Sequence, residues 1–424
     1  MDVSGRMEII RELCSFERRL AGTDAERRAA NRMAERLSAT GHRTEVEPTY
    51  VHPQYGLVHA AHCLLGFAGS LVSIALAPLG FFLVLLAATS MYLDLNYRLY
   101  IIRSLFFRRG SQNVLSRGRH PHRKQKLILC AHLDAARTGT VFAASRARRL
   151  ASLERRLGVA LGPFRILFWS LALLLPILGA RMAGVESDLL SLLQLPPTLV
   201  LLVGVFALVD IELSSVVPGA NDNASGVATA LSLAEELEDE PTESLDVWVL
   251  LTGAEECQQE GMRAFFRAHR DQFDPESTTF LCLDAVGRGD VRYELTAGWV
   301  ISYDLDRRLA ELAEAIAASG REGPRHLNAA PLRHGVAADS LPPRLRGYRA
   351  LAITCLDEDG HAPDRHLATD VPEKLDEAAL ERAHAFALAL IRALDRDLSR
   401  APGTPARPAR RDRVPAPAAS PGPH

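Results

Sequence analysis

Histidines and carboxylates recur along this chain at points where apolar, strand-like runs of residues end. In open α/β sheets, catalytic groups collect at the carboxyl ends of the strands. Buried carboxylates and imidazoles at such an edge either bind a metal ion or carry a large desolvation cost. The residues that share this placement are His132, Asp134, Asp222, Glu255, Glu256, Asp284 and His366.

These residue types favour zinc. Zinc accepts imidazole nitrogen and carboxylate oxygen, and a catalytic zinc site keeps one position open for water. Two zinc ions need about five protein ligands when one carboxylate bridges them. We therefore expect two zinc ions per chain and five metal ligands, which are His132, Asp222, Glu256, Asp284 and His366.

Two carboxylates remain outside this ligand set. Asp134 lies two residues after His132, so on a strand both side chains point the same way. We expect Asp134 to hydrogen-bond the imidazole and to fix its tautomer. Glu255 directly precedes a ligand. We expect it to take a proton from zinc-activated water and to return that proton to the leaving amine.

Each motif by itself also has an ordinary structural explanation. An HxD pair is common in solvated loops, and GAEE could be an acidic surface turn. GANDNASG could be only a helix N-terminus, where Asn and Asp cap and Gly permits the turn. The order of the motifs, their place at strand ends and the complete ligand count together favour a single site.

With these motifs in this order, the sequence resembles the zinc peptidases of family M28, the aminopeptidase Y and aminopeptidase S group. The resemblance implies that Asp222 bridges the two zinc ions and that Glu255 is the general base. The other ligands that it implies are His132 and Glu256, one on each zinc ion, together with Asp284 and His366. The motifs that carry it are HxD at 132–134, DNxSG at 222–226, EE at 255–256, the lone Asp284 and HxxxD at 366–370.

The resemblance extends beyond the motifs, to about residues 6–50, 110–145 and 215–397. It includes an RxAGT turn at 19–23 and a strand with an Asn-Val pair at 113–114. Two departures stand out. The family usually has a Gly-rich turn after the second Glu, whereas residues 257–261 read CQQEG, and the late histidine precedes Leu-Ala instead of Thr-Pro. The first departure bears on the shape of the substrate pocket.

Two other residues compete for places in the ligand set. His361 lies in GHAP, which superficially resembles the histidine motif of the family. We prefer His366, because Asp370 follows it by four residues, ahead of VPEK and a predicted helix. Cys257, beside Glu256, could supply a thiolate, but the five-ligand set does not need one.

Long uncharged runs are the second feature of the chain. Residues 48–93 contain no Asp, Glu, Lys or Arg, which is about twice the length that one bilayer crossing requires. Pro78 and Gly80 interrupt this run and predict helices at 57–77 and 79–96. A second pair is predicted at 166–180 and 189–209, although 166–180 alone could be a buried helix of a soluble protein.

The predicted fold is α/β, with a mixed, mostly parallel central sheet flanked by helices, of the zinc-exopeptidase type. Two transmembrane helical hairpins are inserted into it. The tail at 399–424 is rich in Pro, Ala and Arg and is expected to be disordered. We expect the peptidase domain at 1–56, 97–163 and 214–398 and the hairpins at 57–96 and 164–213.

The charges beside the hairpins predict the orientation. Two hairpins leave all parts of the peptidase domain on one side of the membrane, and the Arg-rich stretches on that side place it in the cytoplasm. We expect a multi-pass protein of the cell (inner) membrane. The start MDVSGRMEII, which shows no signal-peptide pattern, agrees with this. The arginines concerned are Arg98, Arg103, Arg108, Arg109, Arg146, Arg148, Arg149, Arg155 and Arg156.

Charge and cysteine content narrow the function. A net charge of −2 gives no reason to expect a nucleic-acid partner, and six cysteines without CxxC spacing are expected to be reduced thiols. We expect a membrane-anchored aminopeptidase whose partners are a peptide substrate and the lipid bilayer. The alternatives are a non-catalytic membrane scaffold, and a carboxypeptidase or a glutaminyl-cyclase-like acyl transferase on the same fold. A cyclase is expected to use one metal ion.

Overall fold

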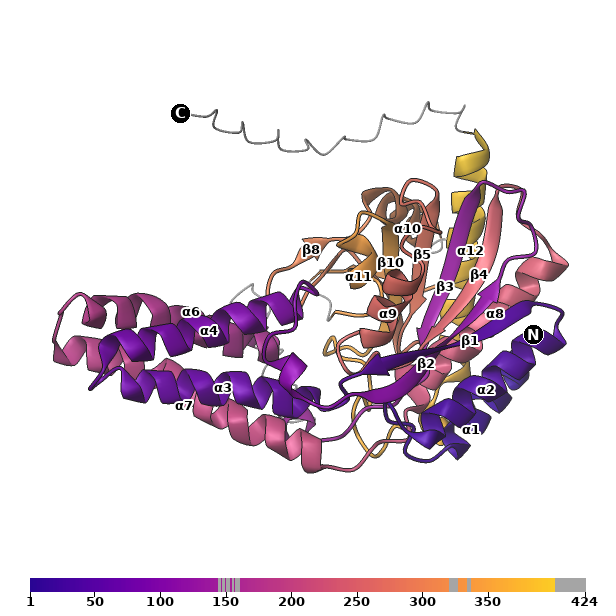
Figure 1. Ribbon diagram of the computed structural model, residues 1–424. Coiled ribbons are helices and arrows are strands. Elements are labelled where there is room, and N and C mark those ends of the chain that lie inside the picture. The colour runs from indigo at the N-terminus through magenta and orange to yellow at the C-terminus, as the bar shows by residue number, and fades with distance from the viewer. Residues whose placement is uncertain are drawn as a thin grey trace, which may run out of the picture.

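An eight-stranded mixed sheet forms the centre of the body, in the order β1-β2-β4-β3-β5-β10-β6-β9 (Figure 1). Strands β4, β3, β5 and β10 are parallel, whereas β1 pairs antiparallel with β2, β2 with β4, and β6 with β10. The predicted α/β class with a mixed, mostly parallel sheet is confirmed. The strands are β1 (Arg43–Val51), β2 (Arg109–Arg117), β3 (Gln125–His132), β4 (Leu245–Thr252), β5 (Thr278–Leu283), β6 (Asp290–Glu294), β9 (Ala330–Leu332) and β10 (Arg349–Leu356), with a separate pair β7 (Thr296–Ala297) and β8 (Tyr303–Asp304).

The computed structural model describes residues 1–143, 161–319, 327–333 and 337–400, together with Arg146, Arg149, Leu153, Glu154 and Arg156. The tail predicted at 399–424 therefore lies outside the described residues, except for its first two. Arg148 and Arg155, which belong to the Arg-rich stretches predicted beside the hairpins, also lie outside them.

Helices cover both faces of the sheet, which explains why the central strands read as continuous apolar runs. Along β3 the side chains alternate between two cores. Leu127 and Leu129 join the core beneath α1, α2, α8, α10 and α12, and Ile128 packs with α9 on the other face. The helices are α1 (Val3–Ser15), α2 (Asp24–Ala39), α8 (Gly226–Asp239), α9 (Glu260–Ala268), α10 (Arg307–Ser319), α11 (Leu341–Arg344) and α12 (Glu377–Arg400), with short turns η1 (Arg103–Leu105), η2 (Thr140–Phe142), η3 (Ala220–Ser225) and η4 (Pro372–Lys374).

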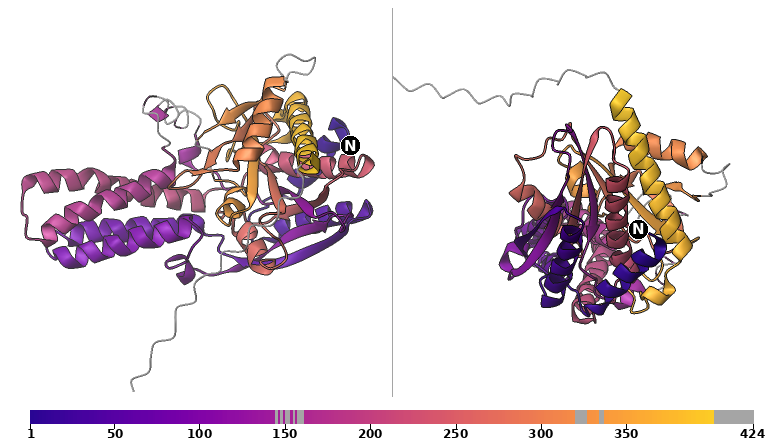
Figure 2. Two further views of the ribbon diagram at one scale, coloured as in Figure 1. Left: turned by 90° about the horizontal axis from the view of Figure 1, so that it is seen from above. Right: turned by 90° about the vertical axis from the view of Figure 1, so that its right-hand side faces the viewer.

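Four further helices form a bundle that extends away from the body (Figures 1 and 2). They pack around an apolar cluster that includes Val84, Leu171 and Leu201 and that continues into the body at Ala254 and Cys257. Among the described residues, these four helices are long and apolar enough to cross a membrane. Each overlaps one of the predicted runs. They are α3 (Tyr55–Val72), α4 (Ala77–Leu95), α6 (Pro163–Met182) and α7 (Asp188–Leu213).

Large apolar side chains cover the outside of the bundle. Such a surface is unfavourable in water, whereas in lipid a helix satisfies its own backbone hydrogen bonds and needs no polar face. The helix pairs are inserted between strands of the sheet: α3 and α4 connect β1 to β2, and α6 and α7 lie between β3 and α8. The exposed side chains include Leu64, Leu71, Phe82, Leu86, Trp169, Leu173, Leu192, Leu199, Val203 and Phe206.

The first hairpin depends on a close helix–helix contact at Gly80. A Cβ atom there would lie 2.5 Å from the carbonyl oxygen of Gly69 and 2.6 Å from the Cα atom of Ser73. We expect Gly80→Ala to lower the free energy of unfolding by about 1–3 kcal/mol, because backbone atoms cannot rotate away from the added methyl group. Thermal unfolding of the purified protein in detergent micelles measures this loss.

Gly179→Ala is the matched control. Gly179 lies in α6 of the same bundle, and a Cβ atom there would meet only the Cε2 atom of Phe81, at 3.8 Å. Both substitutions add the same methyl group and the same gain in helix propensity. Equal melting temperatures for the two variants would contradict the predicted steric conflict.

Candidate metal centre

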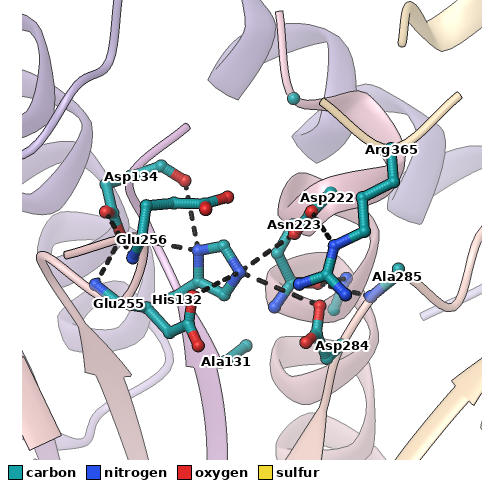
Figure 3. A network of polar contacts seen from close by, with 12 residues as sticks. Ala131, His132, Asp134, Asp222, Asn223, Glu255, Glu256, Asp284, Ala285 and Arg365 are labelled. Atoms are coloured by element: carbon teal, nitrogen blue, oxygen red, sulfur yellow. Dashed lines mark hydrogen bonds and ion pairs between the residues drawn. The ribbon is translucent and has the colours of Figure 1, made fainter. Parts of the chain in front are cut away.

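The predicted site residues converge at the carboxyl ends of the parallel strands, and Figure 3 labels all of them except His366. His132 is the last residue of β3, and Asp284 directly follows β5. Glu255 and Glu256 lie in the turn after β4, and Asp222 lies in η3, ahead of α8. The loop after β10 supplies His366. This is the sheet edge where an open α/β sheet is expected to hold its active site.

Asp222 lies at the centre of the cluster, with one imidazole beside each carboxylate oxygen. The Nε2 atom of His132 is 3.1 Å from Oδ1 of Asp222, and the Nε2 atom of His366 is 3.4 Å from Oδ2. Asp284 lies on the first side, with Oδ1 3.8 Å from Nε2 of His132. Glu256 lies on the second, with Oε2 3.2 Å from Nε2 of His366. The five predicted ligands thus form two groups that share Asp222.

Hydrogen bonds to the backbone hold the Asp222 turn in place. Asp370 accepts from the backbone N–H groups of Asn221, at 2.6 Å, and Asp222, at 3.1 Å. The side chain of Asn223 donates to the carbonyl oxygen of Leu283 and accepts from the N–H of Gly226. The carboxylate of the HxxxD motif therefore holds the turn that carries Asp222.

Arg19 ties the turn to the end of β3. Its guanidinium is buried and donates to the carbonyl oxygens of Leu13, Leu133, Pro218 and Gly219. Four such bonds from one side chain fix the relative positions of three distant segments, since each carbonyl would otherwise need its own partner. The RxAGT motif thus contributes structurally to the site.

Asp134 positions the Glu255–Glu256 pair. Its Oδ1 accepts from the backbone N–H of Glu255 at 3.0 Å, and its Oδ2 accepts from that of Glu256 at 3.1 Å. The Nδ1 atom of His132 lies 3.2 Å from the carbonyl oxygen of Asp134 and 3.4 Å from its Oδ1. The role of Asp134 in fixing the tautomer of His132 stays a prediction. Both its carbonyl oxygen and its Oδ1 lie near Nδ1 of His132.

Glu255 is buried beside the two groups. Its Oε2 lies 3.8 Å from Nε2 of His132, and its Oε1 accepts from the side chain of Gln259 at 2.5 Å. Burial raises the pKa of Glu255 well above its ordinary value, and the nearby charges of Glu256 and Asp339 raise it further. A carboxyl group with a raised pKa suits proton transfer near neutral pH.

The donor atoms fit zinc. Oδ1 of Asp284, Oε1 of Glu256 and Nδ1 of His366 are buried without a hydrogen-bond partner among the described residues. Burial alone would lower the pKa of His366, but the neighbouring Glu256 and Asp222 raise it to about 9. Unpartnered nitrogen and oxygen donors in a site that favours positive charge are what a zinc ion requires.

Three charged residues at the site were not predicted from the sequence. Arg365 places its Nε atom 2.9 Å from Oδ2 of Asp222 (Figure 3). Asp339 bonds the hydroxyl of Thr252, and burial raises its pKa to about 7. Glu294, at the end of β6, is also buried, which raises its pKa to about 8. Only Arg365 carried a signal, because it adjoins His366; the other two belong to no motif.

The two rival ligands lie outside the cluster. His361 belongs to a turn in which its backbone N–H donates to Asp357. Cys257 points into the apolar cluster shared with the helical bundle, and burial raises the pKa of its thiol well above the ordinary value. Of the two candidate late histidines, His361 and His366, it is His366 that lies beside Asp222. All six cysteines are free thiols, as expected.

The glycine kept in CQQEG has a steric reason. A Cβ atom at Gly261 would lie 1.8 Å from the carbonyl oxygen of Gly253. Asn113 bridges the same two glycines, accepting from the N–H of Gly253 and donating to the carbonyl oxygen of Gly261. The strand with the Asn-Val pair therefore holds both ends of the turn that carries Glu255 and Glu256.

Known proteins share this fold. LapB from Legionella pneumophila covers 93% of this chain and 72% of its own, with a TM-score of 0.53 and 12% identity. A Zn-dependent exopeptidase from Parabacteroides distasonis covers 92% and 97%, with a TM-score of 0.53 and 12% identity. A glutaminyl cyclase from Porphyromonas gingivalis covers 94% and 99%, again with a TM-score of 0.53 and 12% identity.

At such identities the structural likeness shows the fold alone. A comparison with curated protein sequences gave no match. The family model of "Peptidase family M28" matches residues 205–391, a segment that includes Asp222, the Glu255–Glu256 pair, Asp284 and His366. The chain therefore has the zinc-exopeptidase fold, and its residues 205–391 match the model of peptidase family M28.

Proposed function

We propose that this protein is a membrane-embedded di-zinc aminopeptidase that removes N-terminal residues from peptides. The observation that carries the proposal is the shared position of Asp222, with His132 at one carboxylate oxygen and His366 at the other. A carboxylate placed in this way can bridge two metal ions. The family M28 segment and the zinc-exopeptidase fold support the same reading.

Each proposed ligand group has one imidazole and one carboxylate in addition to Asp222. His132 and Asp284 form one group, and His366 and Glu256 form the other. Zinc, when bound, would polarise the scissile carbonyl group and lower the pKa of a water molecule. Asp134 would keep the backbone of the Glu255–Glu256 turn in place during the reaction.

Glu255 would move the proton. Its Oε2 faces the cluster from 3.8 Å, while its Oε1 is held by Gln259. We propose that Oε2 accepts a proton from the attacking water and then delivers it to the leaving amine. The raised pKa of Glu255, caused first by burial, makes its carboxylate a stronger base toward the attacking water.

Metal content separates the proposed aminopeptidase from a glutaminyl cyclase on the same fold. Glutaminyl cyclases are among the proteins with a similar structure. We expect a cyclase to hold one metal ion, whereas the proposed aminopeptidase holds two. A non-catalytic scaffold is disfavoured, because all five proposed ligands are present and face one another.

We further propose that the catalytic body faces the cytoplasm. Exposed Arg98, Arg108 and Arg109 follow α4 on the body side, beside the exposed apolar side chains of Leu105 and Phe107. This mixture suits the headgroup region of a bilayer. The prediction that Arg103 belongs to the Arg-rich stretches facing the membrane surface is wrong, because Arg103 is buried and paired with Asp94. Substrates would then be cytosolic peptides or the N-termini of proteins near the membrane.

The first functional prediction concerns metal content. Purified protein should hold two zinc ions per chain, and Asp222→Asn should lose zinc, because the central carboxylate would lose its charge. Elemental analysis with titration of the zinc-depleted protein tests this. Finding at most one tightly bound divalent ion, with no second site, would exclude the two-zinc proposal.

Zinc binding should also release protons at neutral pH. The pKa of His366 is about 9 without metal, so its imidazole is mostly protonated at pH 7 and must lose that proton to act as a ligand. The apparent zinc affinity should therefore weaken as the pH falls below about 9. Calorimetric titration in two buffers with different ionisation enthalpies measures the released protons.

A second prediction separates proton transfer from metal binding. Glu255→Gln keeps the size of the side chain but cannot accept a proton, so turnover should fall by about two to four orders of magnitude. Zinc content should stay at the wild-type value, because Glu255 is outside the proposed ligand set. Turnover of aminoacyl-4-nitroanilides and elemental analysis give both readouts. Near-wild-type turnover would remove Glu255 from the role of general base.

The orientation can be tested by cysteine labelling in intact cells. Asp271 is exposed on the body, and Glu186 is exposed in the loop between α6 and α7. In a Cys14→Ser background, an impermeant thiol reagent should label Glu186→Cys and spare Asp271→Cys until the cells are permeabilised. The opposite pattern would place the body, and its substrates, outside the cytoplasm.

A further inference from the structure

The turn after Glu256 is connected to the membrane helices through two consecutive glutamines. Gln258 and Gln259 both have left-handed backbones, with φ of 67° and 55°, and both side chains are buried. Non-glycine residues keep this backbone only where their surroundings impose it. The turn therefore holds two polar side chains that reach different partners.

Gln259 uses all of its hydrogen-bonding capacity. Its Nε2 donates to Oε1 of Glu255 at 2.5 Å and to the carbonyl oxygen of Ala337 at 3.1 Å. Its Oε1 accepts from the hydroxyl of Tyr97 at 2.5 Å and from Nε1 of Trp299 at 3.3 Å. An amide with every position satisfied is held in one orientation, so the N–H that meets Glu255 cannot turn away.

Tyr97 comes from the membrane side of the molecule. It lies two residues beyond the end of α4, and its hydroxyl also accepts from Nε1 of Trp299 at 3.0 Å. Burial raises the pKa of Tyr97 well above its ordinary value, so the hydroxyl keeps the proton that it donates to Gln259. Because the hydroxyl of Tyr97 bonds Gln259, the position of Gln259 depends on the position of the C-terminal end of α4.

A second set of contacts joins the same turn to both helices of the first hairpin. Arg103, fully buried, donates to Asp94 of α4 at 2.9 Å and to Glu260 at 2.9 Å, and it also bonds Gln258. Oε1 of Gln258 lies 2.9 Å from Nε2 of His59 in α3. Buried ion pairs and hydrogen bonds of this kind resist displacement, because breaking one leaves a buried charge without a partner.

We propose that Gln259 is a positioning residue for Glu255, and that the ends of α3 and α4 hold Gln259 in place. The hairpin would then be part of the active-site scaffold as well as a membrane anchor. This inference rests on the role of general base proposed for Glu255. Gln259 fixes one carboxylate oxygen of Glu255, which leaves the other, Oε2, facing His132.

The chain offers a matched pair of tyrosines for the test. Tyr97→Phe removes the hydroxyl that reaches Gln259 and keeps the ring. Tyr100→Phe removes a buried hydroxyl from the same segment, one that has no hydrogen-bond partner among the described residues. With full-length protein in detergent micelles, Tyr97→Phe should lower kcat about fivefold with KM and zinc content unchanged. Tyr100→Phe should match the wild type.

Gln259→Leu removes the bond to Glu255 itself. We expect it to lower kcat by about tenfold or more, again with wild-type KM and zinc content, as is usual when a group that orients an active-site residue is lost. The proposal is overturned if Gln259→Leu keeps the wild-type kcat, or if Tyr97→Phe behaves like Tyr100→Phe. If Gln259→Leu does not fold, the tyrosine pair decides.

Hydrogen exchange of the zinc-free protein gives a readout that needs no turnover. Backbone amides of 254–260 should exchange about fivefold faster in Tyr97→Phe than in Tyr100→Phe, because the turn loses one of its anchors. Equal exchange rates would overturn the proposed connection. A protein that hydrolyses no aminoacyl substrate would refute the proposed function, and the exchange comparison would still decide whether the hairpin holds the turn.

Discussion

The accumulation of negative charge at one sheet edge is the constraint on which the structure depends. Seven carboxyl groups are buried there within a few side chains of one another. Burial, together with neighbouring carboxylates, raises the pKa of three of them, Glu255, Asp339 and Glu294, because a second negative charge nearby is unfavourable. Arg365 and two imidazoles pair with Asp222 at the centre of the cluster. The edge therefore favours bound cations. The carboxylates are Asp134, Asp222, Glu255, Glu256, Asp284, Glu294 and Asp339.

Several polar side chains around the site hold this unfavourable cluster of carboxyl groups in place by forming hydrogen bonds with backbone groups. Asp134 holds the turn of the glutamate pair, Asp370 and Asn223 hold the turn of Asp222, and Arg19 joins that turn to β3. Asn113 closes the glutamate turn from β2. Because each side chain bonds backbone groups of a distant segment, the geometry of the site depends on contacts between parts of the chain that are far apart in the sequence.

The helical bundle is also in contact with the turn that carries Glu255 and Glu256. Its helices enter and leave the body at the same end, so the turn after Glu256 lies against the ends of α3 and α4 instead of solvent (Figure 1). Ala254 and Cys257 belong to the same apolar cluster as the bundle core. The peptidase body and the hairpins are therefore joined by a packed interface. The CQQEG sequence, which departs from the usual Gly-rich turn, supplies the polar contacts of that interface.

The sequence alone determined the α/β class, the positions of the four apolar helices and the residues that meet at Asp222. These follow from residue type and order, because zinc chemistry admits few side chains and a membrane span requires a long uncharged run. Other features depended on the tertiary structure. The backbone partners of Asp134 and Asp370, the burial of Arg103 and the places of Asp339 and Glu294 carry no residue pattern. A hydrogen bond to a distant backbone amide leaves no mark on the sequence, since every residue type except proline offers that N–H group.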